Sequence, residues 1–299
     1  MVNERTPACL ACDNTDLKVI EARISEWAAE RIFGTPESPP VNLCHCDKCG
    51  FAFFDYRYTD DEAKALYSNY GDDAYQKLRY KYDNTYTERV NNAARNSPVM
   101  LKNRLNHLGS VLSRYITDKQ VSLLDYGGDM GQYIPPVFDG TERYVYEISG
   151  KGVVEGVKPV NDYDELNKLK PFTHIMCNAV LEHLSNIDSD IERIRDLGDE
   201  STIYYFEVPF DSPFYKSKLI FIRLLFNPIY KNTDLVKSFI KRKKDKTPRM
   251  NEHINFFTPM SLEKVLQKNG FAISETGTVK IDCERKIEKV IYAVCKQVT

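Results

Sequence analysis

The alternation of short apolar runs with helical stretches is the feature that most constrains this chain. Apolar runs occupy residues 121–125, 144–147, 174–177 and 202–208, and helical patterns such as 187–197 lie between them. A strand that is apolar along its whole length needs cover on both faces, and parallel sheets obtain that cover from the helices connecting their strands. The second half of the chain is therefore predicted to form an α/β fold with a doubly wound, mostly parallel sheet.

The other segments are predicted as follows. Residues 1–55 have the pattern of short strands and turns, and apolar spacing from 59 to 112 predicts helices. Near the end, a helix is expected at 261–269, and residues 286–296 are expected to form a final strand at the edge of the sheet. The expected domains are a module at 1–58, a helical linker at 59–115, and a larger domain at 116–299 with an insertion at 211–250.

Composition excludes several classes of protein. Apolar residues make up 42% of the 299 residues and charged residues 28%, which is typical of a globular protein. A net charge of -2 gives no overall attraction to nucleic acids or membranes. The sequence shows neither the pattern of a secretory signal nor an apolar run long enough to span a bilayer. A cytoplasmic protein is expected.

Paired cysteines indicate a metal site in the first fifty residues. Two C-x-x-C knuckles occur there, and without an export signal this spacing favours a metal ion over disulfides. Four thiolates complete a tetrahedron around Zn²⁺ and leave no open position, so a structural zinc is predicted. The expected ligands are Cys9, Cys12, Cys46 and Cys49. Cys44 and His45 are alternatives that lack the knuckle spacing.

A glycine motif follows the first predicted strand of the larger domain. Asp125, Gly127 and Gly131 form D-x-G-x-x-x-G, with Gly128 inside it. Glycines at the carboxyl ends of parallel strands let the backbone approach a ligand closely, but this spacing is not the dinucleotide fingerprint. Glu147, about twenty residues on, ends the second strand, where a carboxylate can bind both hydroxyls of a ribose. A nucleoside cofactor without a pyrophosphate is predicted.

With these motifs the chain resembles the class I S-adenosylmethionine-dependent methyltransferases, which have a Rossmann-like fold. Residues 178–184 and 253–271 are similar to two further segments of one large branch of that family, and the resemblance covers most of residues 95–296. The paired cysteines, together with Leu66-Tyr67 and Tyr70, resemble the N-terminal modules of methyltransferases that act on sugars. Those enzymes methylate carbon or oxygen atoms of nucleotide-linked or glycan-linked sugars, so a nucleotide sugar or glycan is the implied acceptor.

The resemblance also implies which residues bind S-adenosylmethionine. The methionine part would lie over the glycine motif, the ribose at Glu147, and the adenine edge at Asp162 or Tyr163. Asn178 and Ala179 would flank the sulfonium, and Tyr70 and Tyr75 would close over the cofactor. The implied cofactor-binding residues are Asp125, Gly127, Gly128, Gly131, Glu147, Asp162, Asn178, Ala179 and Tyr70.

Methyl transfer to a hydroxyl, or to the carbon beside a ketone, needs a base as well as alignment. His183 and His253 are the candidate bases, since the pKa of histidine lies near working pH, and Glu252 is expected to orient or charge-stabilise His253. Structural roles for both histidines are the alternative. Related sugar C-methyltransferases carry a tyrosine where this chain has Met250, which leaves O-methylation at least as probable on the sequence. Glu207 is expected either to reach the acceptor or to cap a turn.

The insertion at 211–250 combines an apolar segment at 218–226 with clustered cations at 241–246. It is predicted to be either a helical lid with a solvated basic end or a patch for a sugar diphosphate or a membrane-held glycan.

Two other functions compete with sugar methylation. Zinc knuckles and the basic run suggest a nucleic-acid-modifying methyltransferase, but the net charge and the lack of a long basic face argue against a nucleic-acid partner. A non-catalytic cofactor-binding scaffold is the second alternative, and the intact glycine motif with Glu147 argues against it.

Overall fold

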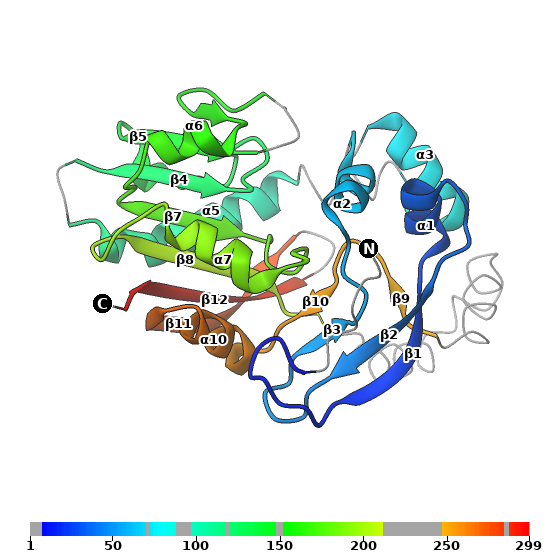
Figure 1. Cartoon of the computed structure of the whole chain (residues 1–299). Helices are drawn as coiled ribbons and strands as arrows, with labels where there is room; N and C mark the ends of the chain where they lie inside the picture. Colours follow the sequence, from blue (N-terminus) through cyan, green and yellow to red (C-terminus); the bar gives the residue numbers. More distant parts are fainter. Residues whose placement is uncertain are drawn as a thin grey trace, which may run out of the picture.

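The computed structural model describes most of the chain. The described residues are 8–69, 72–87, 97–117, 120–147, 152–211, 247–283 and 287–298. They form two sheets that lie side by side, each with helices of its own (Figure 1). Within these residues, no helix is both long and apolar enough to cross a membrane. The predicted lid or membrane patch falls mostly at 212–246, outside the described residues.

The larger sheet has seven strands in the order β11-β12-β8-β7-β4-β5-β6. The strands from β6 to β8 run parallel, and β12 and β11 add to one end in antiparallel pairing. Their bounds are β4 (Ser122–Tyr126), β5 (Glu142–Tyr146), β6 (Lys158–Val160), β7 (His174–Asn178), β8 (Ile203–Pro209), β11 (Phe271–Asp282) and β12 (Ile287–Gln297). The predicted α/β, Rossmann-like and mostly parallel fold is confirmed.

The sequence predicted that the last strand would lie at the edge of the sheet, but it does not. β12 pairs with both β8 and β11, so β11 forms the edge instead. Ile291, Ala293, Val294 and Cys295 of β12 are all fully buried. A nearly unbroken apolar run is typical of a strand covered on both faces, and this run explains why β12 lies inside the sheet.

Helices cover both faces of this sheet. α5 packs on one face through Leu108, Val111 and Leu112, which share a core with alternate residues of β4, β5 and β7. The other face is covered by α7 and α10, and α6 lies over the same face in Figure 1. The helices are α5 (Pro98–Leu112), α6 (Tyr163–Lys168), α7 (Ile187–Arg195) and α10 (Pro259–Lys268), with 3₁₀ turns at Ser113–Tyr115 and Pro136–Phe138.

The smaller sheet has the order β10-β3-β2-β1-β9. Its strands are β1 (Lys18–Ile24), β2 (Pro40–His45), β3 (Ala52–Phe54), β9 (Arg249–Met250) and β10 (Asn255–Phe256), and it is covered by α1 (Glu26–Phe33), α2 (Asp60–Tyr67) and α3 (Asp73–Tyr82). The interpretation of residues 1–55 as strands and turns missed α1. Its signals are Ser25, whose hydroxyl caps the first turn, and Gly34, which ends the helix at a φ of 73°.

The segment from β9 to β10 joins the two parts of the molecule. β9 pairs with β1 at one edge of the smaller sheet and β10 pairs with β3 at the other, so residues 251–254 cross between the edges. The backbone amides of Ile254 and Asn255 both donate to the carbonyl of Glu182, at 2.9 and 3.0 Å. This crossing is therefore tied to the loop that follows β7 of the larger sheet.

Candidate functional site

The glycine motif lies at the carboxyl edge of the larger sheet. β4 has β5 on one side and β7 on the other, so the chain reverses its direction of winding beside β4. Open parallel sheets bind ligands at this switch point. The Gly127 amide donates to the carbonyl of Tyr146 at 2.8 Å, and the Gly131 amide donates to that of Gly128 at 2.8 Å. The loop after β4 is thus held against the end of β5.

Close packing explains the glycines at 127 and 128. Gly127 has a φ of 70°, and a Cβ there would lie 2.6 Å from the side chain of Val180. A Cβ at Gly128 would lie 2.4 Å from the carboxylate of Asp125. Any side chain at either position would push the loop away from β4 and from the loop after β7.

Among the described residues, two polar side chains at this edge have no hydrogen-bond partner for their side-chain atoms. Asp125 is 1% exposed and Asn178 is 8% exposed, and neither the carboxylate oxygens nor the side-chain amide atoms have a hydrogen-bond partner among the described residues. Burial raises the pKa of Asp125 to about 7, against the opposing charge of Arg104. Because buried polar groups are almost always hydrogen-bonded, these atoms fit a ligand with donors and acceptors. Ala179, next along, has a left-handed φ of 55°.

The residues expected at the nucleoside end differ in their surroundings. Glu147 directly follows β5, and its amide donates to the carbonyl of Val160 at 3.2 Å. The carboxylate of Asp162 caps α6 by accepting from the Glu165 amide at 3.0 Å. Tyr163 donates to the carbonyl of Arg193 at 2.9 Å, and the Arg193 guanidinium lies 4.1 Å from its ring centre. Asp162 and Tyr163 thus have partners within the protein.

Of the two tyrosines expected to close over the cofactor, the structure describes Tyr75. Tyr70 lies outside the described residues. Tyr75 is fully buried in the core of the smaller part, where its ring packs against Trp27 at 5.3 Å and its hydroxyl donates to Glu252. Tyr75 was therefore a wrong candidate, because an apolar core already covers its ring.

The structure brings His183 and His253 together. His183 lies in the turn after β7 and His253 in the crossing segment, and their ring centres are 4.8 Å apart. The Nδ1 atom of His183 is 3.0 Å from the carbonyl of Glu252 and 2.9 Å from the hydroxyl of Tyr67. A carbonyl only accepts, so we assign the proton of His183 to Nδ1 and a lone pair to Nε2. Burial and the nearby His253 lower the pKa of His183 to about 4.

His253 is held by an acid that the sequence did not suggest. Its Nδ1 atom lies 3.5 Å from a carboxylate oxygen of Asp211. Burial opposes the charged form of His253, but the bond to Asp211 and the charge of Glu182 outweigh it and raise its pKa. The Glu252 carboxylate accepts from Tyr75 and is paired with Arg79 at 2.5 Å, so of the two expected roles only charge stabilisation fits: the charge of Glu252 also helps to raise the pKa of His253. It is the backbone carbonyl of Glu252 that contacts a histidine.

Glu182 is a site residue that the sequence analysis missed. Its side chain is 1% exposed, and neither carboxylate oxygen has a hydrogen-bond partner in the described part of the chain. One oxygen lies 3.9 Å from Nε2 of His183, and burial raises the pKa of this carboxyl to about 7. Nitrogen or oxygen atoms of Glu182, His183 and His253 all lie within 4.8 Å of one another. The one sequence signal was its position directly before His183.

Glu207 neither reaches an open site nor caps a turn. It is fully buried, is paired with Arg104 of α5, and accepts from the Tyr205 hydroxyl at 2.8 Å. Arg104 also lies over the ring of Tyr133 at 4.7 Å. Arg104 of this ion pair supplies the positive charge that acts on Asp125.

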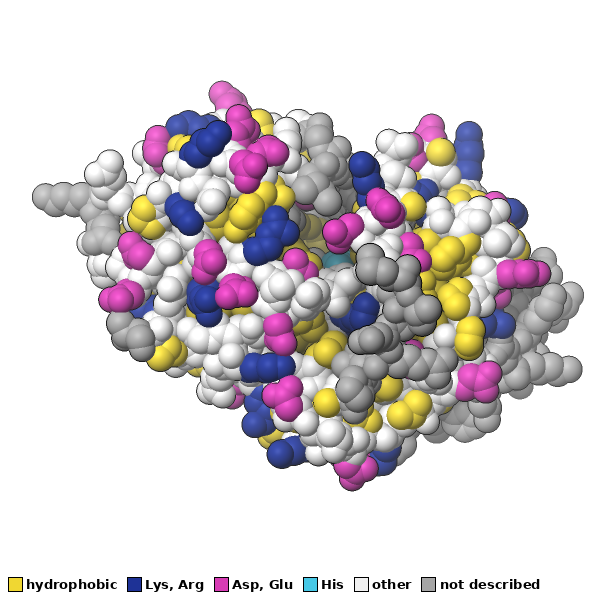
Figure 2. Space-filling view, in the orientation of Figure 1, with side chains coloured by type: hydrophobic (Ala, Val, Ile, Leu, Met, Phe, Trp, Pro, Cys, Tyr) yellow, Lys and Arg dark blue, Asp and Glu magenta, His cyan; other side chains and the backbone are white. Residues whose placement is uncertain are grey.

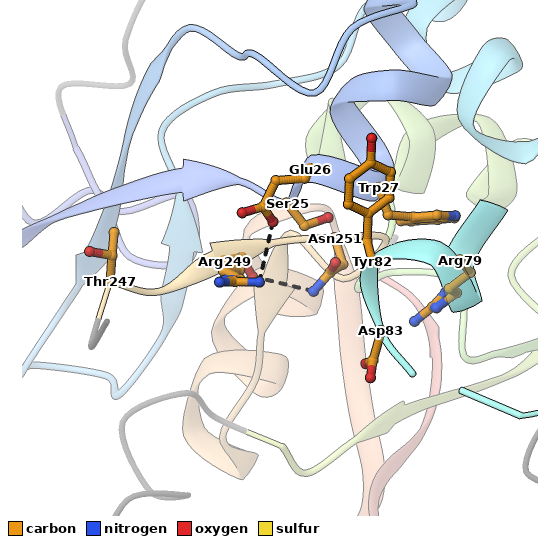
Figure 3. A pocket seen from close by; sticks show the side chains of 9 residues that line it. All are labelled: Ser25, Glu26, Trp27, Arg79, Tyr82, Asp83, Thr247, Arg249 and Asn251. Carbon is orange, nitrogen blue, oxygen red and sulfur yellow. Dashed lines mark hydrogen bonds and ion pairs between the residues drawn. The ribbon is translucent and has the colours of Figure 1, made fainter. Parts of the chain in front are cut away.

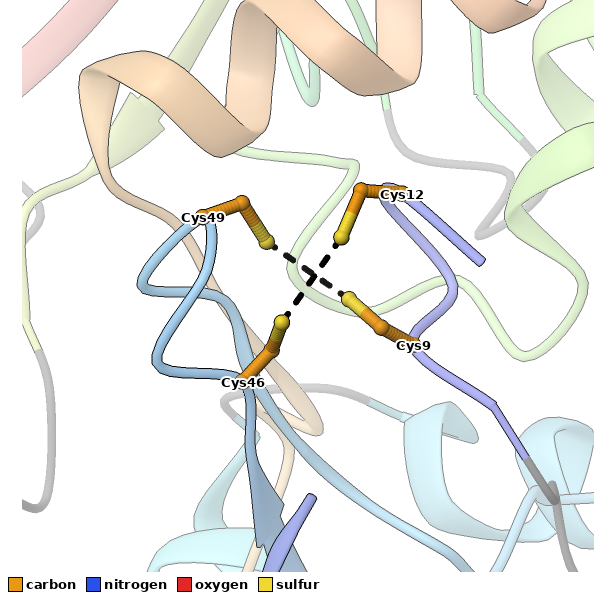
Figure 4. Close-up of side chains that lie close together, drawn as sticks. All are labelled: Cys9, Cys12, Cys46 and Cys49. Carbon is orange, nitrogen blue, oxygen red and sulfur yellow. Dashed lines mark hydrogen bonds between the residues drawn. The ribbon is translucent and has the colours of Figure 1, made fainter. Parts of the chain in front are cut away.

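Four cysteine sulfurs converge where the smaller part meets α10 (Figure 4). The Sγ atoms of Cys9 and Cys49 are 3.6 Å apart, and those of Cys12 and Cys46 are also 3.6 Å apart. Four ligands at the usual Zn–S distance of about 2.3 Å from one ion lie about 3.8 Å apart. The spacing of these sulfurs therefore fits a tetrahedral zinc ion.

The two alternative ligands lie outside this cluster. Cys44 is on β2 opposite Phe53, and Nδ1 of His45 pairs with Asp47 at 3.1 Å. The cluster is fixed to the larger part by α10, since the Thr258 hydroxyl donates to the carbonyl of Cys49 at 2.7 Å. The knuckles thus support the junction between the two parts.

The surface of the molecule is hollowed where its two parts meet. Figure 2 shows a hollow between the two parts of the molecule with a histidine side chain at its floor. A polar pocket of about 310 Å³ opens between α1, α3 and β9 (Figure 3). Its lining residues are Ser25, Glu26, Trp27, Arg79, Tyr82, Asp83, Thr247, Arg249 and Asn251.

No curated protein matches the chain. Among solved structures, the chain is similar to a magnesium protoporphyrin IX methyltransferase from Synechocystis with bound S-adenosylhomocysteine (17% identity, 78% of this chain and 99% of that one, TM-score 0.46). It is also similar to a 1,6-didemethyltoxoflavin N1-methyltransferase from Burkholderia thailandensis (11% identity, 87% and 96%, TM-score 0.47).

A family model described as a methyltransferase domain matches residues 92–276, which include the glycine motif, Glu147 and both histidines. This match covers more than half of the chain. The chain therefore belongs to this methyltransferase family and is a class I, S-adenosylmethionine-dependent enzyme.

Proposed function

We propose that this enzyme methylates an oxygen or carbon atom of a sugar that is linked to a nucleotide or a glycan. The observation that carries the proposal is the pair of imidazoles of His183 and His253 at the carboxyl edge of the sheet, in the loop directly after Asn178 and in the segment tied to that loop. An acceptor that must lose a proton needs such groups, whereas an acceptor that is already nucleophilic needs only alignment.

The residues at the switch point fit S-adenosylmethionine. Buried atoms of Asp125 and Asn178 that find no hydrogen-bond partner in the described part of the chain, and a loop closed to side chains at Gly127 and Gly128, are features of a ligand cradle. We assign the methionine part to this loop and the ribose to Glu147. When bound, the cofactor supplies an electrophilic methyl group on a sulfonium.

His183 is the better placed proton acceptor of the two, because its lowered pKa keeps its ring neutral near pH 7, whereas the raised pKa of His253 favours the protonated form. Its Nδ1 atom is held by the carbonyl of Glu252 and by Tyr67, which fixes the ring and leaves the Nε2 lone pair available. Removing the acceptor's proton as the methyl group arrives is general-base catalysis. His253, fixed by Asp211, would then bind and orient the acceptor.

Support for a sugar comes from the N-terminal part. Its resemblance to the modules of sugar-modifying methyltransferases is joined by the pocket between α1 and α3, whose lining includes the aromatic ring of Tyr82 and the charged side chains of Arg79 and Arg249. Flat apolar rings combined with hydrogen-bonding groups suit a polyhydroxylated acceptor. The four cysteines of the same part would hold a structural zinc ion.

Calorimetry with S-adenosylhomocysteine tests the cofactor site. Wild-type protein is expected to bind with micromolar affinity, and Glu147→Ala is expected to bind at least tenfold more weakly, or about 1.4 kcal/mol. Glu142→Ala is the matched control, because Glu142 begins the same strand and pairs with Lys158 on the surface.

Turnover is then measured with a panel of nucleotide sugars, using S-adenosylhomocysteine release as the readout. Absence of binding in folded, zinc-loaded protein would favour a scaffold over an enzyme. Binding with turnover on nucleic acids but not on sugars would overturn the acceptor assignment.

A further inference from the structure

The proposed reaction gives no role to the buried carboxylate of Glu182. It is almost completely buried, and neither oxygen has a hydrogen-bond partner among the described residues. Leaving a buried carboxylate without a partner is costly, so such groups are normally paired or bound to a metal ion. Glu252 nearby is already paired with Arg79, whereas Asp211 adds a further negative charge on the side of His253.

Both neighbouring imidazoles are held in the manner of metal ligands. His183 is fixed at Nδ1 by the carbonyl of Glu252, and His253 is fixed at Nδ1 by the carboxylate of Asp211. Histidines that bind metals usually donate their other ring nitrogen to a carbonyl or carboxylate in this way, which sets the ring orientation. Nε2 of His183 faces Glu182, and in His253 Nε2 is the ring nitrogen that does not face Asp211.

The separations are close to those of a metal site. The Glu182 oxygen is 3.9 Å from Nε2 of His183, and the ligand atoms of the three residues lie within 4.8 Å of one another. Three ligands about 2.1 Å from one ion lie about 3.4 Å apart in a tetrahedron. Small side-chain rotations would therefore bring the three atoms around an ion.

We propose that Glu182, His183 and His253 bind a divalent transition-metal ion at the floor of the acceptor site. Two imidazoles and one carboxylate suit Zn²⁺, Mn²⁺, Co²⁺ or Fe²⁺ better than Mg²⁺ or Ca²⁺, which prefer oxygen ligands throughout. Three protein ligands leave a coordination position open to solvent or to an acceptor oxygen.

The role of this metal ion rests on the proposed function. The ion would change one step of the reaction, the removal of the acceptor's proton. An acceptor hydroxyl bound to the ion becomes more acidic. Its O–H bond breaks and the proton passes to solvent water, the oxygen forms a bond to the methyl carbon, and the C–S bond breaks to leave the neutral thioether. With both Nε2 atoms engaged as ligands, neither histidine serves as the base.

Metal content and Mn²⁺ binding test the site on the full-length protein. After mild chelation that spares the cysteine site, Mn²⁺ is titrated in and the free ion is followed by electron paramagnetic resonance, with total zinc measured on the same sample. Wild type is expected to hold two metal ions per chain and Glu182→Gln one. His253→Gln, at a partly exposed position, should also hold one. His107→Asn is the control, because His107 lies on α5 beside Tyr205 and Tyr292.

S-adenosylhomocysteine binding is measured on every sample and separates the two hypotheses. Variants that keep this binding but lose one metal ion support the site. One metal ion per chain in both wild type and Glu182→Gln overturns it and leaves methyl transfer with a histidine base, in which a protonated Glu182 donates to an imidazole. Two metal ions in wild type that lacks S-adenosylhomocysteine binding would instead contradict the proposed function.

Discussion

The cysteine cluster and the cluster of Glu182, His183 and His253 differ in how they are built. The four sulfurs come from two tight turns and lie in pairs 3.6 Å apart, close to the spacing around one zinc ion. The histidine cluster joins segments seventy positions apart, and its ligand atoms are spread over as much as 4.8 Å. Four ligands close a site, whereas three leave it open, so the first cluster suits a structural role and the second suits chemistry.

The surroundings of the two clusters also differ. The cysteine cluster shares a core with α10, and Phe51 of the module packs against Phe257 with ring centres 5.0 Å apart. The histidine cluster lies instead between the loop after β7, the crossing segment and α2, where Tyr67 contacts His183. A substitution in the cysteine cluster should therefore lower the stability of both parts, whereas a substitution in the histidine cluster should change the chemistry of the site and leave the stability nearly unchanged.

The largest expected effect is loss of folding on Cys49→Ser. Structural zinc contributes about 10–16 kcal/mol to small zinc-dependent folds, which exceeds the stability of a typical domain. The variant should lose zinc and most of its cooperative unfolding transition, as followed by metal analysis and circular dichroism. Cys44→Ser is the control, since Cys44 is equally buried but outside the cluster. If the Cys49→Ser protein were as stable as the Cys44→Ser protein, the cluster would not have a structural role.

The second effect should appear in turnover and not in stability. His183→Asn removes the Nε2 atom but keeps an amide that can donate to the carbonyl of Glu252. Losing either a general base or a metal ligand should lower kcat by about 10²–10⁴-fold. The unfolding midpoint and S-adenosylhomocysteine affinity should stay near those of His107→Asn. A collapse of stability comparable to that of Cys49→Ser would show that the two clusters do not differ as argued.

The same contrast explains what the sequence could predict. The knuckle ligands lie three positions apart, so spacing alone identifies them, and the apolar runs likewise predict the parallel sheet. The environment of Glu182 depends on which groups the tertiary fold places around it, and no local pattern carries that information. Glu252 and His253 are adjacent in sequence, yet one side chain pairs with Arg79 of α3 and the other with Asp211 after β8.

Buried tyrosines illustrate a further limit. Tyr67 and Tyr75 belong to the same tyrosine-rich region, and their sequence context does not separate them. Tyr67 lies on α2 and reaches His183, whereas Tyr75 on α3 is enclosed with Trp27 in the core of the smaller part. The direction of each helix face decides between the two roles, and that direction depends on packing between α1, α2 and α3.

The smallest expected effect tests whether the N-terminal part tunes the histidine cluster. The Tyr67 hydroxyl is 2.9 Å from Nδ1 of His183 and 3.3 Å from the carbonyl of Glu252, so it helps to fix the ring from the smaller part of the molecule. Tyr67→Phe removes one hydrogen bond worth about 1 kcal/mol and should lower kcat about fivefold with little change in KM. Tyr56→Phe is the control, because it also removes a hydrogen bond of a tyrosine hydroxyl in the same part, 2.6 Å to Glu62 in the first turn of α2. Equal turnover in the two variants would mean that the carbonyl of Glu252 alone orients His183, and the smaller part would then contribute stability to the enzyme but no control over its chemistry.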